Sequence, residues 1–179
     1  MFKKSVAQPL ALAAALLLGA QPALAADDGN TVALHGPDGS VRTFTIDSDH
    51  VLQKGSDGAA GTQVRKASAT ERKALKSLRS KALTADQDSA VIPVLRDAAG
   101  RAWGLPGGLI VTLHTAVSEE EGRAQLEAAG LVPEQRIAPN LWVVQSPAGL
   151  PSIEQANALN ARGLFADVVP NWWNKRTLK

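Results

Sequence analysis

Short runs in which hydrophobic and polar residues alternate mark the beginning of the chain after its first 30 residues. Residues 31–34 and 41–46 are two such runs on either side of a Pro-Asp-Gly turn, and this pattern predicts a β-hairpin. Residues 51–53 form a further short strand candidate, and the small, polar segment 55–61 is typical of a loop. This part of the protein is therefore expected to be β-rich.

A helix and a second hairpin follow. Ser68 and Glu71 have capping-box spacing and predict a helix that continues to about Ala82. Its polar face is basic, which fits either a solvated face or a patch that contacts a partner; the basic positions are Arg72, Lys73, Lys76, Arg79 and Lys81. Residues 90–96 and 101–104 then flank a turn that ends in glycine, which predicts the second hairpin.

The pattern becomes more regular in the second half of the chain. Residues 109–114 predict a strand. Ser118 and Glu121 have capping-box spacing, with three carboxylates in the first turn, where the helix dipole favours them. This helix is expected to reach Ala129 and to end at Gly130, because glycine readily takes the left-handed conformation after a helix.

Two extended segments, a helix and a last strand complete this half. Residues 131–137 and 141–145 flank a Pro-Asn turn. Capping-box spacing over Ser152–Gln155 predicts a helix that ends before Gly163, and 165–169 reads as the final strand. The element order is βαββαβ within about 60 residues, which is the split βαβ or ferredoxin-like arrangement.

The expected fold class is therefore α+β. A ferredoxin-like unit is expected at 105–170, with a β-rich N-terminal region containing one helix at 26–104 and a C-terminal tail at 171–179. In such a unit both helices cover one face of the sheet, and the bare face must be covered or must serve as an interface. The N-terminal region could cover it, and alternation alone leaves both possibilities open.

Strand alternation supplies candidates for this bare face. It separates Thr112, His114, Trp142 and Val144 from a second set made of Leu109, Val111, Leu113, Leu141 and Val143. We assign the first set to the bare face, with Thr112, His114 and Trp142 as candidate contact residues.

Residues 1–25 have the three parts of a secretory signal peptide. A positively charged start precedes an apolar run at 10–18, and Ala23-Leu24-Ala25 supplies the small-x-small pattern that predicts cleavage before Ala26. The alternative is a membrane anchor, but the apolar run is far shorter than the roughly 20 residues of a spanning helix. The expected location is the periplasm or the outside of the cell.

Removal of the signal peptide changes the charge of the protein. Lys3 and Lys4 are lost, so 17 of the 19 basic residues remain against 17 acidic residues. A neutral chain gives no reason to expect a nucleic-acid or membrane-surface partner. The absence of cysteine excludes disulfides and thiolate metal sites.

The sequence gives little reason to expect catalysis. The three histidines, His35, His50 and His114, are scattered and have no metal-ligand spacing. No nucleophile elbow, phosphate-binding loop or acid pair is present in the sequence. We therefore expect a non-enzymatic protein without metal or cofactor, monomeric when free.

The second half resembles the prodomains of subtilisin-like serine proteases. The resemblance covers about residues 105–173 and rests on five segments: 105–113 (LPGGLIVTL), 126–131 (LEAAGL), 141–145 (LWVVQ), 153–163 (IEQANALNARG) and 165–172 (FADVVPNW). No catalytic domain follows, and an additional region precedes the unit. This combination is most similar to the separately encoded external chaperones of propeptide-lacking, kexin-like proteases in Gram-negative bacteria.

The resemblance implies that this chain helps an exported subtilisin/kexin-like protease to fold and remains bound as its inhibitor. The bare sheet face would dock on two protease helices, and Asp167 is the matching candidate to cap their N-termini; it could equally be an ordinary exposed strand residue. The tail would enter the substrate cleft. Its candidates are Asn171, the adjacent Trp172 and Trp173, and the dibasic pair Lys175 and Arg176, which a kexin-like cleft prefers.

Several alternatives stay open at this point. One of the two tryptophans could pack on the protein's own sheet, and dibasic pairs also occur by chance. A stand-alone periplasmic inhibitor or protein-binding module without foldase activity would use the same surface. A structural envelope protein is a third possibility, marked by tight self-association.

Overall fold

The structure is a computed structural model that describes residues 30–55, 58–80 and 91–174. The expected signal peptide, its cleavage site before Ala26, and the dibasic pair Lys175 and Arg176 lie outside the described residues.

The N-terminal region forms five strands of a six-stranded antiparallel sheet, and the start of the C-terminal tail adds the sixth. Its main path runs β1-β2-β4-β5-β10, and β3 pairs with β2 beside this path. The strands are β1 (Thr31–His35), β2 (Val41–Gly55), β3 (Gly58–Lys66), β4 (Ile92–Arg96), β5 (Ala102–Gly104) and β10 (Trp173–Asn174). The two predicted hairpins are confirmed as β1–β2 and β4–β5.

The β2 strand differs from the sequence-based expectation. Residues 51–53 are the continuation of β2 rather than a separate strand. The loop predicted at 55–61 is wrong in part, because β3 begins at Gly58, and Gly58 pairs with Gly55 of β2. A bulge between Asp47 and Val51 bends β2, so that it pairs with β1 before the bend and with β3 after it.

Helix α1 (Ala69–Ser80) packs against the outer side of this bent strand. The predicted capping box is confirmed: the Ser68 N–H donates to the Glu71 carboxylate at 2.8 Å, and the Glu71 N–H donates to Ser68 Oγ at 3.3 Å. Leu75 is fully buried beside Val51 and Ala67 in a small separate core. The basic side chains on the first turns of the helix are exposed.

The C-terminal half forms a four-stranded sheet with two helices. The elements are β6 (Leu109–Thr112), α2 (Glu119–Ala128), β7 (Pro133–Ala138), β8 (Leu141–Val144), α3 (Leu150–Arg162) and β9 (Asp167–Pro170). The sheet order is β7-β8-β6-β9, and every neighbouring pair is antiparallel. The fold class is α+β, and the βαββαβ order agrees with the prediction.

Of the two capping boxes predicted in this half of the chain, one is confirmed and the other is wrong. The Ser118–Glu121 capping box and the left-handed glycines after both helices are present. The capping box predicted at Ser152 is wrong: α3 begins at Leu150 with Gly149 as N-cap, and Ser152 Oγ donates to the Gly149 carbonyl at 2.8 Å. Pro151 explains the earlier start, because proline is favoured in the first turn of a helix.

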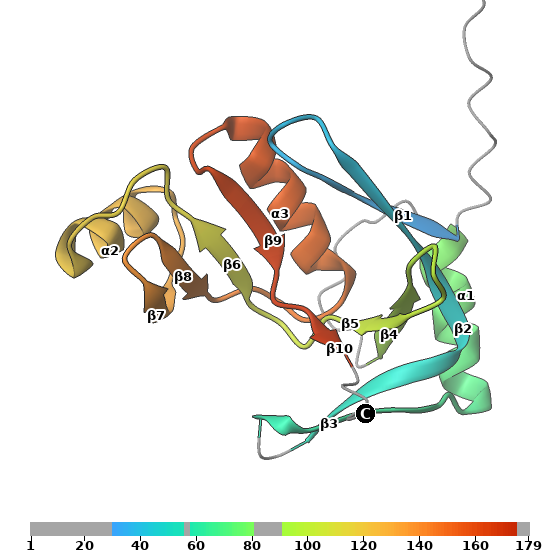
Figure 1. The fold of residues 1–179 in the computed structure, drawn as a ribbon. Helices are drawn as coiled ribbons and strands as arrows, with labels where there is room; N and C mark the ends of the chain where they lie inside the picture. Colours follow the sequence, from blue (N-terminus) through green and yellow to red (C-terminus); the bar gives the residue numbers. More distant parts are fainter. Residues whose placement is uncertain (1–29, 56–57, 81–90, 175–179) are drawn as a thin grey trace, which may run out of the picture.

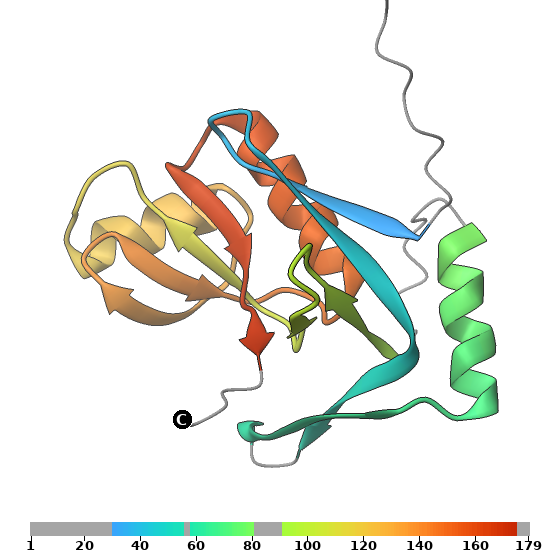
Figure 2. The same cartoon turned by 45° about the vertical axis from the view of Figure 1, so that its right-hand side comes forward.

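The two parts of the chain share one core. Helices α2 and α3 lie on the same side of the four-stranded sheet, and the β1–β2 hairpin lies beside α3 (Figures 1 and 2). Buried residues from the hairpin, such as Val32 and Phe44, belong to the same cluster as Leu109 and Ile153. The hydrophobic core is therefore continuous across residue 105, the predicted boundary between the two regions.

Candidate protein-binding surface

Trp142 is part of the hydrophobic core. It pairs with Val111, and both side chains point to the helix-covered side, where Trp142 is 1% exposed. A Cβ added at Gly122 of α2 would lie 2.8 Å from the Trp142 ring, so the two elements are in close contact. The prediction that Trp142 lies on the bare face with Thr112 is wrong, and the same correction applies to Val144, which is fully buried.

The opposite side of the sheet carries a different set of residues, which we call the open face. One row across the strands consists of Leu141, Thr112 and Asp167, and the next consists of Val143, Ile110 and Val169. All six are partly exposed, and four of them are large and apolar. Within the described residues no helix covers this side (Figure 2).

The open face therefore contains Thr112 and Asp167, as expected, and four apolar residues that the sequence analysis did not select. Two of these, Leu141 and Val143, were assigned to the opposite set, and that assignment is wrong. Ile110, Val143 and Val169 occupy the centre of the surface. The signal for Ile110 was present, because it shares the alternation of Thr112. His114 is exposed but follows the end of β6, so it lies outside this strand pairing.

Asp167 lies at the margin of the open face. Its side chain is partly exposed and has no ion-pair partner among the residues that the structure describes. It contributes, with Arg42 and Asp38 from the β1–β2 hairpin, to a hollow of about 350 Å³. Its carboxylate is thus available to hydrogen-bond donors of a partner.

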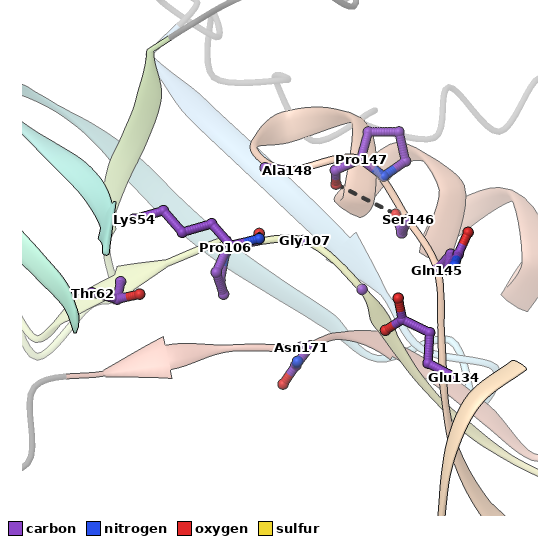
Figure 3. Close-up of a pocket in the computed structure, with 11 residues that line it drawn as sticks. Lys54, Thr62, Pro106, Gly107, Glu134, Gln145, Ser146, Pro147, Ala148 and Asn171 are labelled. Atoms are coloured by element: carbon purple, nitrogen blue, oxygen red, sulfur yellow. Dashed lines mark hydrogen bonds between the residues drawn. The ribbon is translucent and has the colours of Figure 1, made fainter. Parts of the chain in front are cut away.

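At one end the open face meets a polar hollow of about 620 Å³ (Figure 3). Gly108 is one of the residues that line it, and its N–H donates to the Ser146 carbonyl while its carbonyl accepts from the Asn171 N–H, each at 3.0 Å. The positive φ of Gly108, 82°, is a conformation that other residues rarely adopt, so this position is kept free of a side chain. Lys54 and Glu134 lie on opposite walls.

The first residues of the expected tail are folded against the protein itself. Trp172 packs with its ring centroid 4.9 Å from Phe44 and 5.8 Å from Trp103. Directly after it, Trp173 and Asn174 form β10 and pair with Gly104 and Trp103 of β5. Of the alternatives for the two tryptophans, the structure therefore shows Trp172 on the protein's own core.

The energetics favour this docking of Trp172. Full burial of a tryptophan removes roughly 150–250 Å² from water, which corresponds to an upper limit of roughly 4–6 kcal/mol at about 25 cal/mol per Å²; Trp172 is partly buried and contributes less than this. The indole N–H is buried and has no acceptor among the residues that the structure describes, which costs about 1–3 kcal/mol. The ring contacts with Phe44 and Trp103 add roughly 0.5–1.5 kcal/mol each beyond the buried area, and with the buried area they offset this cost.

Hydrogen bonds also hold the neighbouring aromatic residue in place. Trp103 Nε1 donates to Asp97 Oδ2 at 3.0 Å, and Arg101 Nε donates to the same oxygen at 2.8 Å. The bond from Trp103, together with the bonds from Arg101, lowers the pKa of Asp97 to about 2. The turn before β5 thus fixes the ring against which Trp172 packs.

Two amide side chains of α3 close the edges of the two sheets. Asn157 donates to the Ala33 carbonyl at 2.9 Å and accepts from the His35 N–H at 2.8 Å. Asn160 donates to the carbonyls of His35 and Val168 and accepts from the Val168 N–H. The outer edges of β1 and β9 are therefore paired with side chains rather than left open.

The described residues contain no group of three or more His, Cys, Asp or Glu side chains that could hold a metal ion. Among the helices described, none has the length and apolar character needed to cross a membrane. In comparisons with known proteins, no family model, curated protein or solved structure matches the chain.

Proposed function

We propose that this chain is an exported intermolecular chaperone and inhibitor of a subtilisin/kexin-like serine protease. The open face docks on the protease, and the chain after Asn174, with Lys175 and Arg176, enters the substrate cleft. The signal peptide delivers the chain to the compartment in which its protease folds. The free protein is a monomer in the periplasm or outside the cell.

The observation that carries this proposal is the apolar centre of the open face. Ile110, Val143 and Val169 form a row across three strands and remain partly exposed. An apolar sheet face without a covering layer is typical of an interaction surface. An apolar surface that spans several strands suits a protein partner, for which a stable interface buries about 800 Å² on each side.

The ferredoxin-like assignment is part of the same proposal. The strand order β7-β8-β6-β9 and the βαββαβ connectivity support it, as does the resemblance of residues 105–173 to subtilase prodomains. Asp167 would accept hydrogen bonds from the N–H groups at a helix N-terminus of the protease, a position where a negative charge is favourable.

The foldase activity has a simple physical basis. A subtilisin-like fold depends on parallel, non-local strand pairing, which forms slowly. A rigid protein that binds the native-like surface stabilises that state by mass action. The same contacts keep the mature protease inhibited until the complex dissociates.

A charge on the open face tests the docking surface. We expect Ile110→Asp to weaken inhibition of a subtilisin/kexin-like protease by about a hundredfold or more, because an interface would bury the new carboxylate without a partner. Ala124→Asp, on the exposed side of α2, is the matched control and is expected to inhibit like the parent chain. Equal inhibition by both variants would refute docking through this face.

Refolding distinguishes the chaperone from its alternative, a stand-alone inhibitor. A denatured subtilisin/kexin-like protease without its own prodomain is diluted from denaturant with and without this chain, and recovered activity is measured after the complex is dissociated. We expect recovery only when the chain is present. If the chain inhibits the native protease but does not increase the recovered activity, the chaperone role is refuted and only the inhibitor function remains.

A further inference from the structure

We infer that the N-terminal sheet holds the start of the tail, residues 171–174, with Trp172 as the positioning residue, and that this segment stays docked while the chain inhibits a protease. This inference rests on the proposed function and gives the N-terminal sheet a role in it. We call residues 171–174 the tail root.

The tail root is held on both sides of Trp172. Before it, the Asn171 N–H donates to the Gly108 carbonyl at the end of the four-stranded sheet. After it, Trp173 and Asn174 pair with β5 of the six-stranded sheet. The root therefore crosses from one sheet to the other and is fixed to each (Figure 1).

Trp172 occupies the centre of this crossing. It packs against the shared core and contacts rings from two different strands, Phe44 in β2 and Trp103 in β5. The position of the root thus depends on residues that lie far away in the sequence, in a region that the prodomain resemblance does not include.

Docking of the root determines where the next residues begin. Lys175 and Arg176 follow Asn174 directly in the sequence, so a fixed Asn174 restricts the starting point of the dibasic pair. A segment that is already positioned loses less conformational freedom on binding, and its affinity is higher for that reason. The open face and the chain that follows the fixed root then act as two linked binding elements with a high effective concentration.

A reversible cross-link tests whether the root stays docked. The chain has no cysteine, and Trp103 and Asn174 are direct antiparallel partners, a pairing whose Cα separation of about 4.5–5.5 Å suits a disulfide. In Trp103→Cys/Asn174→Cys, inhibition of a kexin-type protease is measured on a dibasic peptide substrate in the oxidised and the reduced form. The reduced form is the matched control for the loss of the Trp103 side chain.

We expect the oxidised form to inhibit as well as the reduced form, within about threefold, or better. Inhibition at least about tenfold weaker in the oxidised form would overturn the inference, because the tail root would then have to leave β5 before the protease can bind.

Substitution of Trp172 tests its positioning role. Trp172→Ala is expected to raise the inhibition constant by about 10–100-fold, whereas Trp172→Phe, which keeps an aromatic ring, stays within about threefold of the parent. Thermal unfolding checks that both variants fold. Hydrogen exchange reports the root directly. Consecutive residues of an antiparallel pair alternate in their hydrogen bonding, so one of the two amides of Trp173 and Asn174 donates to β5; this amide should be protected in the parent and in Trp172→Phe, and should exchange freely in Trp172→Ala.

The outcomes separate this inference from the proposed function. Free exchange at both Trp173 and Asn174 in the parent chain would overturn the inference alone, since it needs no protease to be observed. Equal inhibition by the parent and a folded Trp172→Ala variant would also overturn it. If the parent inhibits no subtilisin- or kexin-like protease, the proposed function fails and the positioning role fails with it, even if one of these amides is protected.

Discussion

Asn160 provides a sharp test of how the two sheets are joined. Its side chain is 6% exposed. Nδ2 donates to the His35 carbonyl at 2.8 Å and to the Val168 carbonyl at 2.9 Å, and Oδ1 accepts from the Val168 N–H at 2.9 Å. Asn160→Ala removes three hydrogen bonds at once and leaves three backbone groups without these partners.

The size of the effect follows from the burial of these groups. A buried polar group that loses its partner costs about 1–3 kcal/mol. Water can enter the space left by the amide and hydrate part of the exposed backbone, so we expect a loss of about 3–4 kcal/mol in the free energy of unfolding rather than the full sum. Asn157→Ala removes two hydrogen bonds at a more exposed position and should cost about 1–2 kcal/mol.

Asn160→Asp separates the donor role from the acceptor role. The aspartate keeps one oxygen for the Val168 N–H but places a second, negatively charged oxygen against two carbonyl groups. We expect it to be at least as destabilising at pH 7 as the alanine variant.

The assay is urea-induced unfolding of the chain from Ala26, followed by tryptophan fluorescence at 25 °C. An alanine variant that loses less than about 1 kcal/mol, or an aspartate variant as stable as the parent, would refute the reasoning, because the amide would then not hold the edge of β9. A second consequence is expected at high protein concentration: the uncovered β9 edge should increase self-association, measured by light scattering.

Two further predictions concern packing and pH. Gly122→Ala should lower the free energy of unfolding by about 1–3 kcal/mol, because its Cβ would lie 2.8 Å from the Trp142 ring. In the double variant with Trp142→Phe, the loss should be smaller than the sum of the two single losses. Additive losses measured by urea unfolding would contradict the contact. Hydrogen bonds from Trp103 and Arg101 lower the pKa of Asp97 to about 2, so its stabilising contribution is present above pH 4 and is lost as the pH falls from about 4 towards 2. Asp97→Asn should lack this part of the acid destabilisation. If the free energy of unfolding depends on pH in the same way in both proteins, the contribution of Asp97 is refuted.

Much of the fold follows from local signals in the sequence. The hairpins follow from alternation around glycine-containing turns, and the capping boxes at Ser68 and Ser118 place two helix starts. The glycines at 130 and 163 end two helices, because they adopt the left-handed conformation that glycine favours. These features depend on residues a few positions apart, so the sequence alone determines them.

The misplacement of Trp142 illustrates the limit of this reasoning. Alternation shows which residues of one strand share a face, but it does not show which face packs against the helices. In β8 both faces are apolar, so the assignment depends on the pairing of Trp142 with Val111 and on the space left by Gly122. Only the tertiary structure supplies these contacts.

The position of the tail root could not be predicted from the sequence for the same reason. Trp172 is held by Phe44 and Trp103, and Asn160 is bonded to His35, a residue 125 positions away. No local pattern encodes such pairs, because they arise only when two separate sheets pack on a common core. The sequence by itself determined most of the elements, the βαββαβ order of the second half and the presence of two adjacent tryptophans; it did not show the strands β3 and β10. The tertiary structure decided which side of the sheet is open and that Trp172 packs against the protein's own core, because both depend on contacts between distant segments.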